Sequence, residues 1–177
     1  MLKFKIKKYK PVSIYLNPKS SQLTLKGVLG FAEVPLPINN KIEINKNLNF
    51  LKLICSNKGE FFSFYKVFFK SFVGVSFGWS LRFEVLGRGY FVNSYKNLLF
   101  FNLGFSHSIC LLLPTNIKCK VDSSKKTKFV LFGSDFRELK TLSFEIKNLR
   151  KMNAYKQNGI KFEDEIIKLK PGKQGNN

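Results

Sequence analysis

The segment Phe61-Phe-Ser-Phe-Tyr-Lys-Val-Phe-Phe-Lys-Ser-Phe72 decides the fold of the first half of this chain. Its aromatic side chains recur at steps of one, three and four residues, which is the spacing of one face of an α-helix. That face is predicted to contain Phe61, Phe62, Tyr65, Phe68, Phe69 and Phe72, and the opposite face Ser63, Lys66 and Lys70. Because the spacing is helical, we interpret the rings as core residues rather than as a surface on which bases stack. We expect one amphipathic helix that packs on a sheet.

Short strands are predicted on the N-terminal side of this helix. Turn-forming residues, among them Asn17-Pro18, Gly30 and Asn39-Asn40, separate short stretches that are rich in β-forming residues. The predicted strands are Val12–Leu16, Gln22–Lys26, Phe31–Pro35, Lys41–Ile44 and Leu48–Leu53.

The same order, strands and then a helix, recurs in the second half of the chain. The predicted strands are Trp79–Val85, Tyr90–Val92, Leu98–Leu103, Ile117–Val121 and Lys128–Phe132. Ser134 is a suitable N-cap for the helix that follows. Its predicted apolar stripe is Phe136, Leu139, Leu142, Ile146 and Leu149.

These patterns predict an α+β fold of two similar small domains, each an antiparallel or mixed β-sheet packed on one main helix. In each half one predicted strand ends in glycine, at Gly27 and at Gly133. Basic extensions are expected at both ends of the chain. The predicted parts are a basic N-terminal arm (1–10), a first domain (11–76), a second domain (77–152) and a basic C-terminal tail (153–177).

The chain carries a large positive charge. Its 31 Lys and Arg against 11 Asp and Glu give a net charge of +20 in 177 residues. Such a charge destabilises a compact chain unless a polyanion neutralises it, which indicates nucleic acid first and an anionic membrane surface second. Most of the basic residues are lysines, which act as point charges rather than as planar forks. We therefore expect binding to a nucleic-acid backbone rather than reading of bases.

The first ten residues alternate lysine with apolar side chains and contain no apolar run typical of a signal peptide. We expect this arm to be disordered until it lies on an anionic surface. The chain is also rich in Lys, Asn, Phe and Ile and contains only two alanines, which is typical of an A+T-rich genome. We interpret the source as an organellar genome, with synthesis in the compartment of use.

Cysteine spacing and hydropathy exclude several classes of protein. Cys55, Cys110 and Cys119 lack CxxC spacing, which argues against a disulfide framework and against a zinc site. We expect reduced thiols in the core. The uncharged run Ser71–Leu81 is shorter than the roughly 20 residues of a membrane span. We expect no membrane span, no metal and no cofactor.

Two turns carry polar or basic residues. Gly87 and Gly89 flank Arg88 between predicted strands, which we interpret as a hairpin whose main chain can approach a phosphate. The alternative is an ordinary turn with a solvated arginine. The second turn holds Ser106 and His107, the only histidine. Without further ligands or an oriented base, a single histidine forms neither a metal site nor a catalytic dyad, so we interpret both residues as loop residues able to contact RNA.

The C-terminal segment Tyr155-Lys-Gln-Asn-Gly-Ile-Lys161 combines an aromatic ring and two lysines with Gly159, which suits a phosphate backbone. The positive charge continues at Lys168, Lys170 and Lys173. We interpret the acidic trio Glu163–Glu165 as a solvated cluster or as a partner of nearby lysines rather than as a catalytic pair. No other stretch combines an acid, a base and a nucleophile, so we expect no enzymatic activity.

Several of these segments together resemble the large-subunit ribosomal protein L-six family of bacterial type. They occur in the family's order, at Leu86–Tyr90, Leu103–His107, Gly133–Asp135 and Tyr155–Glu165. The stretch Gln22–Glu33 resembles the corresponding strand and turn of the family's first half, so the resemblance covers nearly the whole chain. Departures from the family pattern are Met152–Ala154 for a proline-bearing, arginine-rich lead-in, Gln157-Asn158 for a Gly-Lys pair, and Ser108 for a proline.

The resemblance implies two duplicated α+β domains on the large subunit, in contact with rRNA near the sarcin-ricin loop and the base of the factor-binding stalk. The implied partners are large-subunit rRNA and neighbouring large-subunit ribosomal proteins, with no small-molecule substrate. Together with the tail lysines, the residues carried over give a predicted rRNA-binding set of Gly87, Arg88, Gly89, Ser106, His107, Tyr155, Lys156, Gly159, Lys161, Lys168, Lys170 and Lys173.

The expected function is that of a structural constituent of an organellar ribosome in the mitochondrial matrix, with a plastid as the alternative location. Two alternatives come from other classes of protein. A free RNA-binding protein predicts a soluble pool, and a peripheral membrane protein held by lysines and phenylalanines predicts flotation with lipid.

Overall fold

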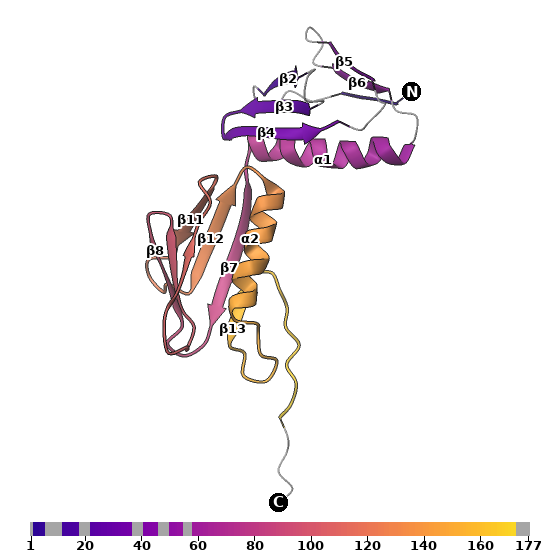
Figure 1. The fold of residues 1–177 in the computed structure, drawn as a ribbon. Coiled ribbons are helices and arrows are strands. Elements are labelled where there is room, and N and C mark those ends of the chain that lie inside the picture. Colours follow the sequence, from indigo (N-terminus) through magenta and orange to yellow (C-terminus); the bar gives the residue numbers. More distant parts are fainter. Residues whose placement is uncertain are drawn as a thin grey trace, which may run out of the picture. The chain divides into compact units, whose positions relative to one another are not determined.

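A computed structural model describes residues 2–5, 12–17, 22–36, 41–45, 50–54 and 58–172 of the chain (Figure 1). The chain forms two compact units. The first unit comprises residues Met1–Trp79 and Ser134–Phe136, and the second unit comprises Ser80–Gly133 and Arg137–Asn177. Both contain β-sheet, so the predicted α+β class is confirmed.

The described strands of the first unit form two antiparallel sheets. One has the order β2-β3-β4 and the other the order β1-β6-β5. The strands are β1 (Leu2–Lys5), β2 (Ser13–Asn17), β3 (Gln22–Gly27), β4 (Gly30–Pro35), β5 (Lys41–Asn45) and β6 (Phe50–Ile54). The five strands predicted here are confirmed, with ends shifted by one or two residues.

Part of the N-terminal arm is a strand. Leu2–Lys5 forms β1, whose residues pair with β6 from Leu2 opposite Leu53 to Lys5 opposite Phe50. The expectation of a disordered arm is therefore wrong for these four residues. Its alternation of lysine with apolar side chains has the period of a strand, and the second sheet provides an edge that accepts it.

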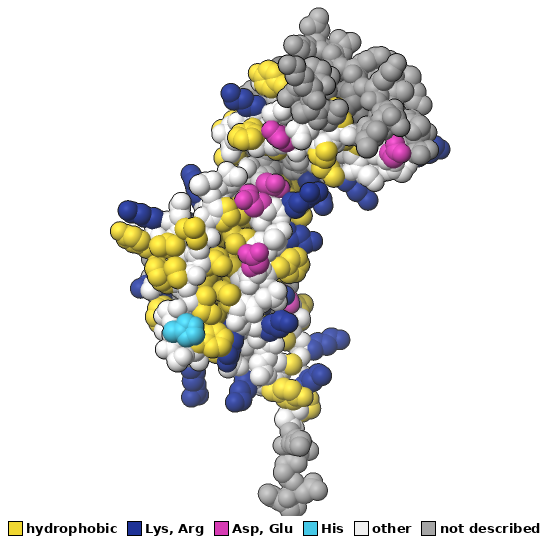
Figure 2. Space-filling view, in the orientation of Figure 1, with side chains coloured by type: hydrophobic (Ala, Val, Ile, Leu, Met, Phe, Trp, Pro, Cys, Tyr) yellow, Lys and Arg dark blue, Asp and Glu magenta, His cyan; other side chains and the backbone are white. Residues whose placement is uncertain are grey.

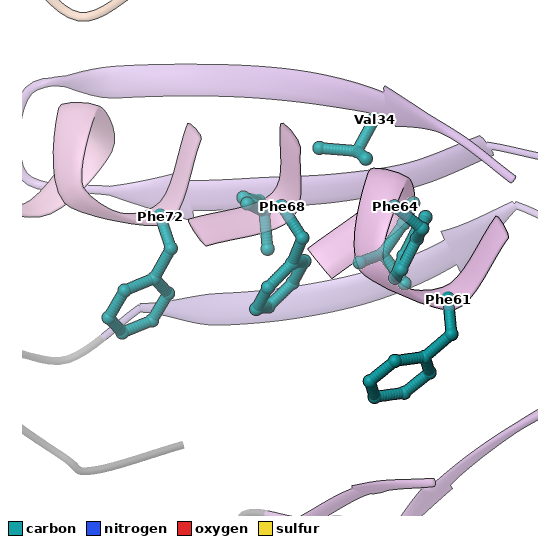
Figure 3. Close-up of a cluster of buried hydrophobic side chains, with 7 residues drawn as sticks. Val34, Phe61, Phe64, Phe68 and Phe72 are labelled. Atoms are coloured by element: carbon teal, nitrogen blue, oxygen red, sulfur yellow. The ribbon is translucent and has the colours of Figure 1, made fainter. Parts of the chain in front are cut away.

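Helix α1 (Lys58–Ser76) packs on β3 and β4, as predicted, with a buried face that matches the predicted one in part. Figure 3 shows the rings of Phe61, Phe64, Phe68 and Phe72 along one side of the helix, and all four are buried together with Leu23, Leu25 and Val34. In contrast, Phe62 and Phe69 are 55% and 51% exposed.

The predicted stripe is therefore confirmed at Phe61, Phe68 and Phe72 and wrong at Phe62 and Phe69, and it lacks Phe64. Phenylalanines on this helix satisfy helical spacing along two overlapping stripes, and spacing cannot distinguish them. The sheet selects the stripe at i, i+3, i+7 and i+11, whose rings stack along the helix at centroid distances of 6.0 Å for Phe64–Phe68 and 6.1 Å for Phe68–Phe72.

The two strand-ending glycines have different surroundings. A Cβ atom on Gly27 would lie 2.5 Å from Cγ1 of Val75 and 2.9 Å from the Val75 carbonyl oxygen, so the end of α1 leaves no room for a side chain. A Cβ atom on Gly133 would meet its nearest neighbour, Cγ1 of Ile117, at 3.4 Å. Both strands end in glycine, but only at Gly27 does the surrounding structure exclude a side chain.

The second unit contains two sheets, with the orders β11-β12-β7-β13 and β10-β9-β8. Its elements are β7 (Trp79–Leu86), β8 (Phe91–Tyr95), β9 (Leu98–Asn102), β10 (Ile109–Leu112), β11 (Ile117–Val121), β12 (Lys128–Gly133), α2 (Phe136–Leu149) and β13 (Gly159–Phe162). The five strands predicted in this half are confirmed, whereas β10 and β13 were not predicted. Asp135 rather than Ser134 precedes the first residue of α2.

Aromatic rings and α2 build the core of the second unit. The rings of Phe83 and Phe129 stack at 4.8 Å, and the edge of Phe101 from β9 approaches Phe129 at 5.8 Å. The predicted stripe of α2 supplies three buried residues, Leu139, Leu142 and Ile146.

The predicted core position of the cysteines is wrong for Cys110, which is exposed on β10, and Cys55 lies outside the described residues. Cys119 is half-buried, and burial raises the pKa of its thiol from 9.0 to about 12, which keeps it protonated. None of the helices in the described parts of the chain is both long and apolar enough to cross a membrane.

The position of the helix face gives a first prediction. Phe64→Ala removes a ring that is 5% exposed and should lower the free energy of unfolding of the first unit by about 3–5 kcal/mol. Phe62→Ala removes an exposed ring from the same helix and should change it by about 0.5 kcal/mol or less. Urea unfolding followed by hydrogen exchange of peptides from α1 and β3 measures both variants. A larger loss for Phe62→Ala than for Phe64→Ala would show that the helix buries the stripe expected from spacing alone.

Candidate nucleic-acid interface

The turn after β7 carries Arg88. The Tyr90 N–H donates to the carbonyl of Gly87 at 3.3 Å, and Gly87 and Gly89 have φ angles of 149° and 71°, which favour glycine. Arg88 is exposed at the tip. The turn is not the hairpin that we predicted, because β7 and β8 belong to different sheets. It connects a strand of one sheet to a strand of another, so the two strands do not pair with each other.

Tyr90 joins this turn to the loop after β9. Its ring is buried, and a Cβ atom on Gly87 would lie 2.5 Å from it. A Cβ atom on Gly104, in the second loop, would lie 2.7 Å from the same ring. Both loops therefore pack on one aromatic ring through positions that only glycine can occupy. Two segments predicted separately from the sequence are held side by side by this contact.

The second loop exposes the two polar residues predicted for it. Ser106 and His107 are both exposed, and the Ser106 Oγ and His107 Nδ1 atoms lie 3.5 Å apart in a long hydrogen bond. Figure 2 shows the histidine near several Lys and Arg side chains at one end of the second unit.

Arg150 connects the end of α2 to the same loop. Its guanidinium carbon lies 4.7 Å from the ring centroid of Phe105, a cation–π contact. The Arg150 carbonyl oxygen accepts a hydrogen bond from the Ile160 N–H at 3.0 Å. The chain leaving α2 and the chain entering β13 are thus both fixed beside the loop that carries His107.

Between these two points the chain forms a closed loop organised by Asn153. The Asn153 side-chain oxygen accepts hydrogen bonds from the N–H groups of Tyr155 at 2.8 Å and Lys156 at 3.2 Å. The main chain of Asn153 also donates to Asn158 at 3.0 Å and accepts from Gln157 at 3.0 Å. An asparagine that bonds to main-chain groups two and three residues on is typical of a turn. The loop presents Tyr155, which is 61% exposed, and Lys156 to solvent.

Gly159 closes the loop and cannot carry a side chain. Its φ angle is 142°, and a Cβ atom would lie 2.8 Å from both the Lys151 carbonyl oxygen and the Met152 Cα atom. The glycine that we predicted to approach a phosphate is buried against its own chain. Its function in this structure is to let the loop turn into β13.

The segment predicted as the basic C-terminal tail contains a strand of the sheet. β13 pairs antiparallel with β7, from Gly159 opposite Leu86 to Phe162 opposite Phe83. This pairing brings the Asn153 loop next to the turn that carries Arg88. Lys161 lies on the strand, 3.2 Å from a carboxylate oxygen of Glu84, and its side chain is only 19% exposed. It is paired within the protein, unlike Lys156.

The acidic trio is divided between partners. Glu163 Oε1 accepts a hydrogen bond from Lys128 Nζ at 3.2 Å, and Glu163 also lies 3.8 Å from Arg82. The hydrogen bond from Lys128 to Glu163 and the nearby charge of Glu84 raise the pKa of Lys128. Our interpretation of the trio as a partner of nearby lysines is thus correct for Glu163.

Glu165 anchors the chain after β13 on helix α2. Lys147 Nζ donates to its two carboxylate oxygens at 2.7 and 2.6 Å, and the Phe162 N–H donates to Oε2 at 3.3 Å. The bonds from Lys147 hold the pKa of Glu165 below its ordinary value of 4.5. Beyond it, Lys168 and Lys170 are exposed, and Lys173 lies outside the described residues.

Sequence reasoning missed the residues that assemble this site. Tyr90, Arg150 and Asn153 organise the loops but were assigned no role. The signals available were weak: a tyrosine after a glycine turn, an arginine at the end of a helix, and an asparagine in a loop. In the described parts of the chain, no group of three His, Cys, Asp or Glu side chains is arranged to hold a metal ion.

The left-handed conformation of Gln157 gives a second prediction. Gln157 has a φ angle of 54°, in a region that glycine adopts without steric cost, and it stands where the resemblance leads us to expect glycine. Gln157→Gly should raise the free energy of unfolding of the second unit by about 0.5–1 kcal/mol. Gln157→Ala keeps a Cβ atom and should give no gain. Urea unfolding compares the three proteins, and equal stability of the Gly and Ala variants would contradict the argument.

The Lys147–Glu165 pair gives a third prediction, about pH. A carboxyl group whose pKa is lower in the folded than in the unfolded state stabilises the fold above its unfolded pKa, and this contribution disappears as the pH falls through the folded pKa. Wild type should therefore be more stable than Glu165→Gln at pH 7, and the difference should shrink as the pH falls below 4.5 and disappear once Glu165 is protonated in the folded state. Urea midpoints across this range test it. A constant difference would assign the effect to packing rather than to charge.

Comparison with known proteins relates the chain to large ribosomal subunit proteins. No family model matches the chain. The large ribosomal subunit protein uL6 of Thermodesulfovibrio yellowstonii is 37% identical over 102 residues, which cover 58% of this chain and 56% of that protein. The uL6 protein of Hydrogenobaculum is 33% identical over 177 residues, covering 93% of each chain.

A third relative matches over almost the full length of both proteins. The mitochondrial uL6m of Reclinomonas americana is 33% identical over 175 residues, which cover 93% of this chain and 94% of that protein. Identity at this level over both units cannot come from one shared motif. The chain belongs to the uL6 family of large ribosomal subunit proteins.

Proposed function

We propose that this uL6 protein is a structural constituent of a mitochondrial ribosome that binds large-subunit rRNA with one end of its second unit. The observation that carries the proposal is the convergence of three segments on that end: the Arg88 turn, the His107 loop and the Asn153 loop. Tyr90, Arg150 and the pairing of β13 with β7 hold them together.

The exposed side chains of this end suit contact with a folded RNA. Arg88 supplies a planar fork for a phosphate, and Lys156, Lys168 and Lys170 supply point charges. Tyr155 offers a ring on which an unpaired base can stack. In the part of the chain that the structure describes, none of these four cations pairs with a carboxylate, so each is available to a phosphate.

Two members of the predicted set receive a different role. Gly159 shapes the loop, and Lys161 neutralises Glu84 inside the protein. We propose that both act indirectly, by fixing the geometry of the Asn153 loop. Gly87 also acts indirectly, since the Tyr90 ring leaves no room for a side chain there, whereas Gly89 has open space around it where a phosphate fits.

The location on the ribosome and in the cell is also part of the proposal. The resemblance to the family implies rRNA near the sarcin-ricin loop and the base of the factor-binding stalk. The mitochondrial relative and the A+T-rich composition support a mitochondrial ribosome, with a plastid as the alternative. The role is bracing rather than catalysis, in line with the ribosomal names of the relatives.

Charge reversal at the proposed interface is the fourth prediction. Arg88→Glu with Lys156→Glu should weaken binding of the full chain to a transcript of the 3′ domain of the large-subunit rRNA. If each residue neutralises one phosphate, the slope of log K against log salt should fall by about 1.4–1.8. Filter binding at salt concentrations from about 50 to about 300 mM measures this slope.

A matched control separates local contact from overall charge. Lys118→Glu with Lys125→Glu makes the same change in net charge at two exposed positions on β11 and in the turn after it. This control should retain most of the wild-type slope. Equal losses in the two double variants would assign binding to net charge alone and would refute the proposed interface.

Sedimentation tests the assignment to the ribosome separately. In a sucrose gradient of organelle lysate, the wild-type protein should migrate with the large subunit through moderate salt. Recovery only in light fractions would favour a free RNA-binding protein, and flotation with lipid would favour a peripheral membrane protein.

A further inference from the structure

The outward face of the β10-β9-β8 sheet is apolar and unoccupied by the rest of the described chain. The strand register brings Tyr95, Leu98 and Leu112 into one row across the three strands, and Phe100 and Cys110, with the polar Asn93, into the next. Leu112 is 72% exposed and Tyr95 is 63% exposed. Figure 2 shows hydrophobic side chains gathered over this part of the second unit. Leaving them in water is unfavourable, and such a patch is typical of a surface that another molecule covers.

We propose that this face docks a segment of a neighbouring ribosomal protein that carries apolar side chains flanked by Asp or Glu. The charge pattern determines this choice of partner. From Tyr90 to Thr115 the sequence has no acidic residue, and Lys96 is its only lysine or arginine. The Lys96 ammonium lies 5.5 Å from the ring centroid of Tyr95, at the edge of the face.

Further cations border the face on one side. β11 lies against β8, and its Lys118 and Lys120 are exposed. An apolar centre with a cationic border is complementary to a segment with an apolar centre and acidic flanks.

Two other occupants fit less well. A second copy of this chain would bring Lys96 towards a molecule of net charge +20, and like charges oppose that contact. RNA would need several cations within the face to neutralise its phosphates, but between Tyr90 and Thr115 the sequence offers only Lys96, at the edge. A protein segment can cover the apolar centre with apolar side chains and pair its acidic residues with the lysines at the border.

The loop after β9 shows why the partner belongs to the ribosome. This loop, with Ser106 and His107 at its tip, connects β9 to β10, so the apolar face adjoins the end that we propose to bind rRNA. A protein seated on the face would lie beside that RNA. The inference rests on membership of the uL6 family and on the face itself, and it does not require the proposed rRNA contacts to be correct.

Native residues allow a direct test in purified large subunits, which is the fifth prediction. The reactivity of the exposed Cys110 thiol shows whether the face is covered. Coupling of the Lys96 amine to a carboxylate identifies the molecule that supplies the acidic flank. Alkylation with N-ethylmaleimide, read at Cys110 by mass spectrometry, should be fast in the isolated full chain and at least about tenfold slower in subunits, because a docked segment excludes the reagent. The protection should persist after RNase digestion.

Zero-length carbodiimide coupling identifies the chemistry of the occupant. Lys96 should couple to an Asp or Glu of another ribosomal protein, within a segment that also carries apolar residues. Leu112→Asp places a charge in the face and should restore fast alkylation of Cys110. Thr115→Asp makes the same charge change at an exposed position beyond the strand and should leave the protection intact.

Each contrary result overturns the proposal in a recognisable way. Equal alkylation in the isolated chain and in subunits would show that nothing covers the face. Loss of protection on RNase treatment would assign the face to RNA. A dimer of the isolated full chain in sedimentation equilibrium would assign the face to a second copy. Absence of a cross-link from Lys96 to a carboxylate would contradict the proposed acidic flank of the partner.

Discussion

The antiparallel pairing of β13 with β7 is the interaction on which the candidate interface depends. It sets Gly159 opposite Leu86, one residue before the turn that carries Arg88, and so brings the Asn153 loop beside that turn. The packing of Tyr90 against Gly87 and Gly104 then adds the loop with His107. Neither glycine can be replaced by another residue without displacing the ring, because a Cβ atom at either position would overlap it. The four residues of β13 are therefore more important to the surface than their number suggests.

Charge is distributed unevenly between structure and surface. The chain has few acidic residues, and three of them, Glu84, Glu163 and Glu165, neutralise lysines around the sheet and α2. These pairs fasten the C-terminal segment to the second unit. The lysines that remain exposed keep their full charge towards a polyanion. The same side chain thus serves the fold or the ligand according to whether a carboxylate lies within reach.

Much of the fold followed from local patterns, and the errors have identifiable causes. Strands such as Gln22–Gly27 and Ile117–Val121 were predicted because alternation and turn residues act locally. Helix α1 was predicted, but its buried face only in part, because its phenylalanines fit two stripes and packing on the sheet selects one of them. The Arg88 turn was taken for a hairpin because adjacent strands usually pair, whereas β7 pairs with β12 and β13. The predicted rRNA-binding residues stay a prediction, and the structure adds which of them are exposed, such as Lys156, and which are held within the protein, such as Gly159 and Lys161.

The sequence by itself determined the α+β class, the positive charge, the family and the segments that carry Arg88, His107 and Lys156, because periodicity, composition and motifs are properties of neighbouring residues. Only the tertiary structure decided that Lys156 is exposed while Lys161 is paired with Glu84, and that an apolar face remains open on β8 to β10. The reason is physical: exposure and ion pairing depend on groups far apart in the chain, and strand pairing and ring packing bring those groups together.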